Sequence, residues 1–215
     1  MILEHLDRIV FTGDSVTDMQ RARPVGEGLF NNLGHGYVRV IDNMLNAWYP
    51  ERAIRVSNTG IDGNTSRDLK ERFQTDVIDL KPDWISICIG INDVWRQFDT
   101  PSMPDCHVYP DEYEKNLEEM MLSVKDRVKG IFIMTPYYME TNKDDPMRKC
   151  METYIEICKK LAEKHRCGLI DLQAVFDGYF QYRHSAYIAW DRVHPNQVGA
   201  TLIAKAFLEE CEFEF

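Results

Sequence analysis

A serine whose hydroxyl is suited to nucleophilic attack lies in the segment Thr12-Gly13-Asp14-Ser15, directly after a short apolar run. A serine in a turn between a strand and a helix has an exposed hydroxyl, and its own N–H lies near a helix N-terminus. Both properties suit a nucleophile that must also stabilise an oxyanion. Taken alone, the segment favours a serine that only caps a helix, so other residues must decide.

A general base and its orienting carboxylate are offered near the C-terminus, where Asp191 and His194 are three residues apart. Pro195 disfavours the α region for His194 and is expected at the first position of the last helix, which keeps the histidine in a loop. A turn can then bring the Asp191 carboxylate to Nδ1 and leave Nε2 free to accept the Ser15 proton. The spacing alone is weak evidence, since a single histidine is more often structural.

Two further segments offer hydrogen-bond donors for a developing oxyanion. Residues 58–65 contain two glycines three apart, which permit unusual backbone angles, and Gly63 is expected to present its N–H outward. The alternative is an ordinary turn before a helix capped by Thr65 or Ser66. Asn92, in Gly90-Ile91-Asn92-Asp93, can donate its amide hydrogens as a neutral group that does not compete for protons. Its alternative is a local Asx turn.

Short apolar runs precede all but the last of these segments, and amphipathic stretches separate them. The apolar runs predict five strands, at Arg8–Thr12, Ala53–Asn58, Trp84–Gly90, Gly130–Thr135 and Gly168–Leu172. Helical periodicity is found at Tyr37–Trp48, Ser66–Leu80, Tyr113–Val128, Met147–His165 and Gln197–Cys211. Alternating strands and helices predict an α/β fold, a three-layer α/β/α sandwich of flavodoxin-like type around a central parallel five-stranded sheet.

Ligands in such folds bind at the carboxyl ends of the strands, which is where the serine, glycine and asparagine segments lie. Together the four segments supply a nucleophile, two further donors, and a base with its orienter. Because each segment supplies a different component of one catalytic site, we expect acyl transfer through a Ser15–His194–Asp191 triad, with Gly63 and Asn92 in the oxyanion hole.

Composition limits the remaining possibilities. The 215 residues contain 25 Lys and Arg against 35 Asp and Glu, a formal charge of −10, which argues against a nucleic-acid partner. No linker or repeat interrupts the sequence, so residues 1–215 are expected to form one domain. The acidic start and the lack of a long apolar run predict a cytoplasmic protein that does not cross a membrane. The six cysteines include no CxxC pair and are expected to be free thiols.

The four segments resemble, in the same order, the four blocks of the SGNH (GDSL-type) hydrolase superfamily. Carried over by position, the resemblance implies that Ser15 is the nucleophile and an oxyanion donor, and that Gly63 and Asn92 are the other donors. It implies His194 as base, oriented by Asp191, with no cofactor and no metal. One departure from many relatives is Asp62, which places a carboxylate where they carry serine before the glycine.

A closer resemblance is to the cytoplasmic bacterial acetylxylan esterases within this superfamily, which remove acetyl groups from xylo-oligosaccharides. It rests on Arg21–Pro24, Leu80–Trp84, Ile91–Arg96, Met134–Tyr137 and Ala189–Pro195. The resemblance implies a small acetylated carbohydrate as substrate and a homo-oligomer, with an apolar patch expected to include Phe213 and Phe215. Trp95 and Trp190 flank the catalytic blocks and are candidates for stacking on sugar rings, with core packing as the alternative.

Two other functions are kept open. A thioesterase or lysophospholipase of the same superfamily would use the same triad, although no acyl-chain groove is evident in the sequence. A non-catalytic flavodoxin-like protein would instead bind phosphate at residues 12–17. The carboxylates of Asp14 and Asp18 disfavour that interpretation, because they would repel an anion.

Overall fold

The apolar runs form one sheet, with strand order β2-β3-β1-β4-β5-β6, in the computed structural model, which describes all residues 1–215. The strands are β1 (Arg8–Gly13), β2 (Gly26–Glu27), β3 (Arg55–Asn58), β4 (Trp84–Cys88), β5 (Gly130–Met134) and β6 (Gly168–Ile170). All five predicted strands are confirmed, with ends that differ by one or two residues. The α/β sandwich is confirmed as well.

The prediction of five strands is one strand short. The five predicted strands are parallel to one another, and β2 pairs antiparallel with β3 at the sheet edge. Strand β2 contains two residues, Gly26 and Glu27, so it has no alternation of apolar and polar side chains from which it could be recognised. It leaves the parallel core unchanged.

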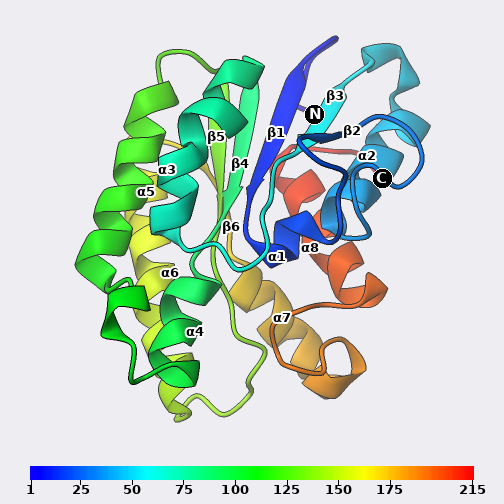
Figure 1. Ribbon diagram of the computed structural model, residues 1–215. Coiled ribbons are helices and arrows are strands. Elements are labelled where there is room, and N and C mark those ends of the chain that lie inside the picture. Colours follow the sequence, from blue (N-terminus) through cyan, green and yellow to red (C-terminus); the bar gives the residue numbers. More distant parts are fainter.

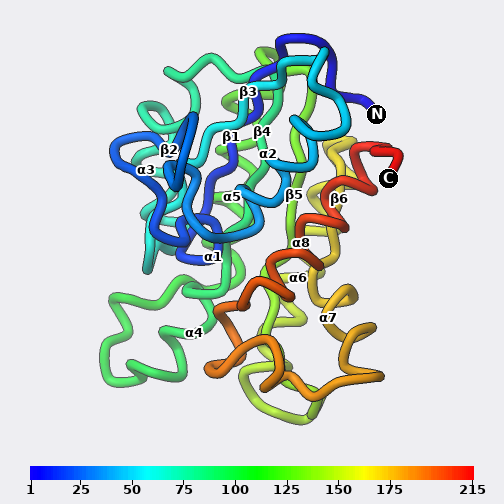
Figure 2. Tube along the Cα trace, turned by 90° about the vertical axis from the view of Figure 1, so that its right-hand side faces the viewer, coloured from blue at the N-terminus to red at the C-terminus, as the bar shows by residue number.

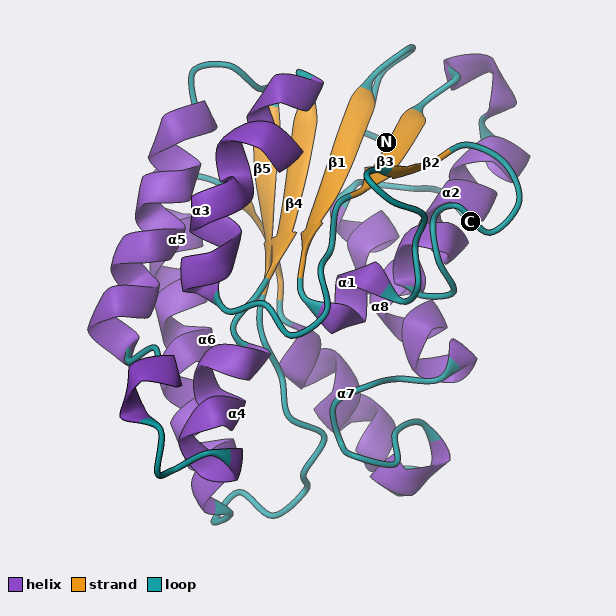
Figure 3. Cartoon of the chain, in the orientation of Figure 1, coloured by secondary structure: helices purple, strands orange, loops and turns teal.

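Helices cover both faces of the sheet (Figures 1 and 3). One layer contains α3 (Ser66–Asp76), α5 (Pro110–Val124) and α6 (Pro146–His165), and the other contains α2 (Tyr37–Trp48) and α8 (Gln197–Glu210). The predicted periodic stretches correspond to these five helices. The predicted Ser66–Leu80 helix ends at Asp76, and a 3-10 turn completes the stretch.

Successive residues of the central strand β1 point into two different cores. Ile9 and Phe11 join the core under α2 and α8, whereas Val10 joins the core under α3, α5 and α6. This alternation follows from the two-residue period of a strand that is buried on both faces. The result is a rigid sheet whose carboxyl edge can hold side chains in fixed positions.

Three short helices that the sequence analysis did not predict gather at that carboxyl edge. They are α1 (Ser15–Asp18), α4 (Ile91–Asp99) and α7 (Leu172–Phe180). Figures 1 and 2 both show them beyond the ends of the strands, on the side opposite the N-terminus. Two of them carry candidate site residues, because Ser15 begins α1 and Asn92 lies in the first turn of α4.

Two local expectations are wrong. Pro195 is not in the last helix, because Asn196 caps α8 through its side chain and the helix begins at Gln197. Phe213 is 6% exposed and packs against Trp48 and Tyr49, so of the two C-terminal phenylalanines only Phe215 is exposed. None of the helices combines the length and the apolar character that a membrane crossing requires.

Candidate active site

Ser15 occupies the first position of helix α1, directly after the central strand β1. Asp14 is the N-cap, and its carboxylate accepts a hydrogen bond from the Val16 N–H at 3.0 Å. The helix is therefore capped by Asp14 and not by the serine. As the first helical residue, Ser15 has an N–H without an intrahelical acceptor, which leaves it available to a ligand.

His194 and Asp191 meet Ser15 in the arrangement expected from the sequence. His194 Nε2 lies 2.7 Å from Ser15 Oγ, and His194 Nδ1 lies 2.6 Å from Asp191 Oδ2. The backbone N–H groups of Val193 and His194 both donate to Asp191 Oδ1, at 3.0 and 2.9 Å. The backbone of the turn therefore holds the Asp191 carboxylate at Oδ1, and the carboxylate in turn holds the His194 imidazole at Oδ2.

The hydrogen bonds determine the protonation states that the triad needs. Burial raises the pKa of Asp191, but hydrogen bonds from the His194 ring and from the backbone outweigh it and lower the pKa below its usual value. The ionised carboxylate only accepts hydrogen bonds, so the proton lies on Nδ1 of His194. In the neutral imidazole, Nε2 then carries a lone pair directed at the Ser15 hydroxyl.

Gly63 lies in an exposed turn between β3 and α3, with φ of +76°. Its N–H makes no hydrogen bond to another backbone group, and a Cβ atom at this position would contact nothing within 4 Å. Thr65, not Ser66, caps α3 by a capping box with Asp68. The other glycine of the loop, Gly60, serves close packing, because a Cβ there would lie 2.4 Å from the Asp18 backbone nitrogen.

Asn92 is 2% exposed and lies in helix α4, so it does not form the isolated Asx turn considered as an alternative. Its Nδ2 donates to the Asn64 carbonyl at 2.9 Å, and its Oδ1 accepts from Arg96 at 3.3 Å. One of the two amide hydrogens is thereby used, and the other is free for a ligand. The amide is held from both ends.

The neighbouring Asp93 anchors α4 to α3. Its carboxylate is fully buried and accepts hydrogen bonds from the Ser66 backbone N–H at 3.0 and 3.1 Å and from the Ser66 hydroxyl at 2.5 Å. Burial raises the pKa of Asp93 to about 7, although the hydrogen bonds oppose the shift. Burial also raises the pKa of Asp14 to about 7. Burial therefore makes both of these carboxyls, which lie beside the site, harder to ionise than exposed ones.

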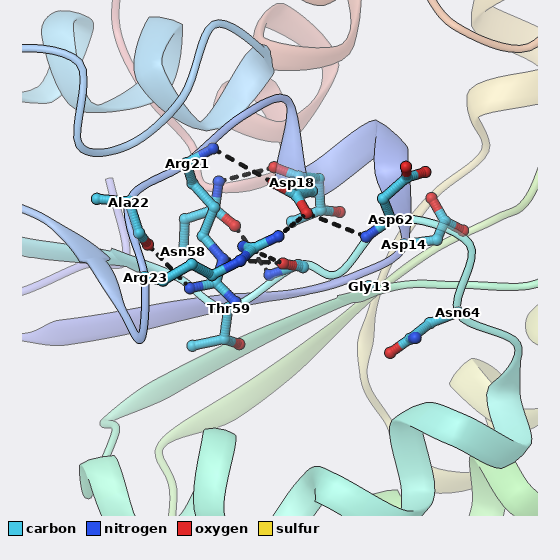
Figure 4. Close-up of polar contacts among 12 residues, drawn as sticks. Gly13, Asp14, Asp18, Arg21, Ala22, Arg23, Asn58, Thr59, Asp62 and Asn64 are labelled. Atoms are coloured by element: carbon cyan, nitrogen blue, oxygen red, sulfur yellow. Dashed lines mark hydrogen bonds and ion pairs between the residues drawn. The ribbon is translucent and has the colours of Figure 1, made fainter.

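Asp18 anchors the Gly63 turn from the other side (Figure 4). Its carboxylate accepts a hydrogen bond from the Asp62 backbone N–H at 3.0 Å and forms an ion pair with Arg23. Asp62 therefore serves the turn through its backbone. Its carboxylate is exposed to solvent beside Ser15, so the departure noted in the sequence does place a negative charge at the mouth of the site.

A pocket of about 400 Å³ opens above the serine and is polar apart from one methionine. Its lining consists of Ser15, Asp18, Met19, Gln20, Arg23, Asp62 and His194. Trp95 is partly buried, with its ring centroid 6.2 Å from that of His194. Trp190 is 97% exposed, so packing in the core does not account for it. The pocket suits a hydroxyl-rich ligand better than an alkyl chain.

Sequence reasoning did not identify Asp18, Asn64 and Arg72, which hold the loops of the site in place. Several of their partners lie far away in the chain: Arg72 donates to the carbonyl of Gly13, 59 residues earlier. No local spacing rule links such residues. The one available signal was polar side chains within or beside the catalytic blocks, and Arg72 lacks even that.

Comparison with known proteins places this geometry in a family. Residues 11–202 match the model of the GDSL-like Lipase/Acylhydrolase family. An acetylxylan esterase from Geobacillus stearothermophilus is 52% identical over 209 residues, covering 97% of this chain and 95% of that protein.

Solved structures give the same result. The crystal structure of Axe2, an acetylxylan esterase from the same organism, superposes with a TM-score of 0.98 at 51% identity, covering 100% of this chain and 98% of that one. Three further Axe2 structures are described as catalytic mutants: S15A, D191A and H194A. LAE5, an alpha/beta hydrolase from the metagenome of Lake Arreo, Spain, gives 0.97 at 48% identity, covering 99% and 98%.

The family match spans most of the chain, and the curated relative covers nearly all of it. The SGNH resemblance read from the sequence is confirmed by both. The chain therefore belongs to the GDSL-like lipase/acylhydrolase family and is an ester hydrolase.

Proposed function

We propose that this chain is a serine esterase that removes acetyl groups from acetylated sugars, namely xylo-oligosaccharides. The observation that carries the proposal is the continuous hydrogen-bonded line from Asp191 through His194 to the Ser15 hydroxyl, with contacts of 2.6 and 2.7 Å. The relative named an acetylxylan esterase, and its catalytic mutants at serine 15, aspartate 191 and histidine 194, support the assignment, since this chain has the same residue types at these numbers.

The reaction proceeds by acyl transfer in two steps. His194 Nε2 takes the Ser15 proton while Oγ bonds to the ester carbonyl carbon, and the oxyanion is held by the Ser15 and Gly63 N–H groups and the Asn92 amide. The bond to the sugar oxygen then breaks, and His194 returns the proton to that oxygen. This leaves acetyl-Ser15 and a free sugar hydroxyl.

Water completes the cycle by the same path. His194 removes a proton from water as the water oxygen attacks acetyl-Ser15, and the proton passes to Oγ when acetate leaves. Asp191 stays ionised throughout and stabilises the imidazolium that forms in each half-reaction. No step requires a metal ion or an organic cofactor.

The pocket chemistry favours a sugar over a long acyl chain. Asp18, Gln20, Arg23 and Asp62 offer donors and acceptors to hydroxyl groups, and Met19 is the single apolar residue of the lining. Trp95 and Trp190 provide ring faces near His194 and Asp191 on which a pyranose can stack. A thioesterase or lysophospholipase would need an apolar channel that this pocket does not offer.

A substrate panel tests the proposal. We expect kcat/KM to be higher for acetyl than for octanoyl 4-nitrophenyl esters, and acetylated xylo-oligosaccharides to release acetate. Ser15→Ala should abolish both activities, while Ser123→Ala, on the remote helix α5, should change neither. A clear preference for octanoyl esters or for acyl thioesters would replace this proposal by the thioesterase or lipase alternative.

We also propose that residues 1–215 form one domain, and that the protein is cytoplasmic and homo-oligomeric. The location and the oligomer are supported by the resemblance to the cytoplasmic acetylxylan esterases, and the single domain by the relative that the chain covers almost completely. Light scattering at micromolar concentration should give a mass above that of one 25.2 kDa chain. A strictly monomeric mass would contradict the oligomer.

A further inference from the structure

Arg72, on helix α3, reaches three oxygen atoms of two loops outside its own helix with one guanidinium group. Its Nε donates to Asn64 Oδ1 at 2.7 Å, one Nη to the Thr59 carbonyl at 2.7 Å, and the other to the Gly13 carbonyl at 2.9 Å. Its side chain is 14% exposed. None of these partners is on the helix that carries the arginine.

Each segment that Arg72 contacts leads into the candidate oxyanion hole. Gly13 lies two residues before Ser15, Thr59 follows strand β3, and Asn64 is the neighbour of Gly63. The Gly13 carbonyl also accepts the Ile61 N–H at 3.0 Å, which ties the same two loops together a second time. The arginine therefore lies beneath the junction of two loops, and each loop contributes one backbone N–H to the site.

Asn64 extends this connection to the third donor. Its side chain accepts from Arg72, and its carbonyl accepts from Asn92 Nδ2 at 2.9 Å. That second bond sets the rotation of the Asn92 amide and so the direction of its free hydrogen. A continuous path runs from the guanidinium through Asn64 to Asn92.

We propose that Arg72 is a positioning residue that fixes the three oxyanion donors relative to one another, acting through Gly13 and Asn64. The inference rests on the proposed acyl-transfer function and deepens it. Oxyanion donors lower the barrier only when they lie at hydrogen-bond distance from the charge that develops, and an error of about 1 Å can cost ~10²-fold in rate. A planar fork of fixed geometry suits this task.

The remaining contact of Arg72 holds the plane of the guanidinium in one orientation. Asp76, one turn later on α3, accepts from the same Nη as Thr59, at 2.9 Å. Lysine cannot replace this arrangement, because its ammonium group is a single point and cannot reach oxygens spread around a planar group. Arg72→Lys should therefore behave like a loss of Arg72 and not like a conservative change.

The test compares Arg72→Met, Arg72→Lys and Asn64→Leu in steady-state hydrolysis of 4-nitrophenyl acetate. Arg67→Met is the matched control, since Arg67 is on the same helix and makes its contacts with Glu112 and with the segment 105–107. It removes a similar number of hydrogen bonds from α3 but none to the loops of the site. Melting temperatures of all variants report the loss of stability separately.

We expect both Arg72 variants to lose ~10- to 100-fold in kcat with KM within about threefold of wild type. Arg67→Met should melt at a lower temperature but keep its kcat. Asn64→Leu should lose ~10-fold, and the double variant Arg72→Met/Asn64→Leu should lose no more than Arg72→Met alone, because both act on the same path. Values of kcat within about threefold of wild type in folded Arg72→Met would overturn the inference.

Where Arg72→Met does not fold, Asn64→Leu decides alone, because it removes only the Nε bond of the arginine in a partly exposed turn. Wild-type kcat in that variant would also overturn the inference. Failure of the proposed function is recognised differently: Ser15→Ala would then still hydrolyse the ester. An inactive Ser15→Ala beside a fully active Arg72→Met leaves the esterase standing and removes only the role of the arginine.

Discussion

Replacing Asp191 by asparagine tests how the carboxylate acts on His194. The side chain would keep its shape but would have one oxygen and one NH₂ group. In the native site, Oδ1 accepts two backbone N–H groups and Oδ2 accepts the His194 ring. If the asparagine oxygen keeps the two backbone bonds, its NH₂ faces Nδ1 and forces the proton onto Nε2. His194 can then no longer accept the Ser15 proton.

The opposite orientation of the introduced asparagine would restore the correct tautomer at the expense of both backbone bonds. At this half-exposed position each bond contributes about 1 kcal/mol. The productive orientation is therefore disfavoured by about 2 kcal/mol, or ~30-fold in population. The loss of the negative charge beside the imidazolium adds to this, so we expect kcat to fall by at least ~30-fold.

The measurement is kcat for 4-nitrophenyl acetate at pH 8 for Asp191→Asn, Asp191→Ala and the control Asp144→Asn, which alters a carboxylate that is 87% exposed. Asparagine should be no better than alanine despite its shape, and the control should match wild type. An Asp191→Asn enzyme about tenfold more active than Asp191→Ala would refute the argument, because it would mean that shape and not tautomer control matters.

Two further predictions concern carboxyls beside the site. Burial raises the pKa of Asp14 to about 7, so between about pH 4 and 7 the folded protein holds a proton that the unfolded chain has lost, and stability falls as pH rises. Asp14→Asn should remove up to ~1.4 kcal/mol per pH unit of that decline in urea unfolding; parallel curves for both proteins would contradict it. Asp62→Ser should raise kcat/KM a few-fold for an anionic hemisuccinate ester at low salt and hardly at all at 1 M salt, with the neutral acetate ester as control. An equal gain at both salt concentrations would exclude an electrostatic cause.

The layered fold could be predicted because its signals are local. The run Trp84–Cys88 is nearly all apolar, and the periodic stretch Tyr37–Trp48 coincides with helix α2. The helix α4 was missed because its first residues belong to the Gly90–Asp93 block, whose glycine and asparagine are also typical of turns. Strand β2 was missed because a strand of two residues is too short to show an alternation of apolar and polar side chains.

The meeting of Ser15, Asp191 and His194 could be predicted from topology together with family blocks, since parallel strands bring their carboxyl ends to one edge. The residues that hold these three side chains in place could not be predicted. Arg72 donates to two backbone carbonyls and to the side-chain oxygen of Asn64, and oxygens of these kinds occur throughout the chain, so these partners leave no mark in the sequence. Asp18 is similar, because it holds the backbone N–H of Asp62 and not a side chain.

The most direct test of the central claim is to locate the nucleophile with a covalent probe. Diethyl 4-nitrophenyl phosphate transfers its phosphoryl group to an activated serine and releases nitrophenolate, so intact-protein and peptide mass spectrometry can identify the modified residue. We expect one diethylphosphoryl group per chain, on Ser15, with esterase activity lost in proportion. We also expect no modification and no turnover in Ser15→Ala. Modification of another residue, or turnover retained in Ser15→Ala, would contradict the account.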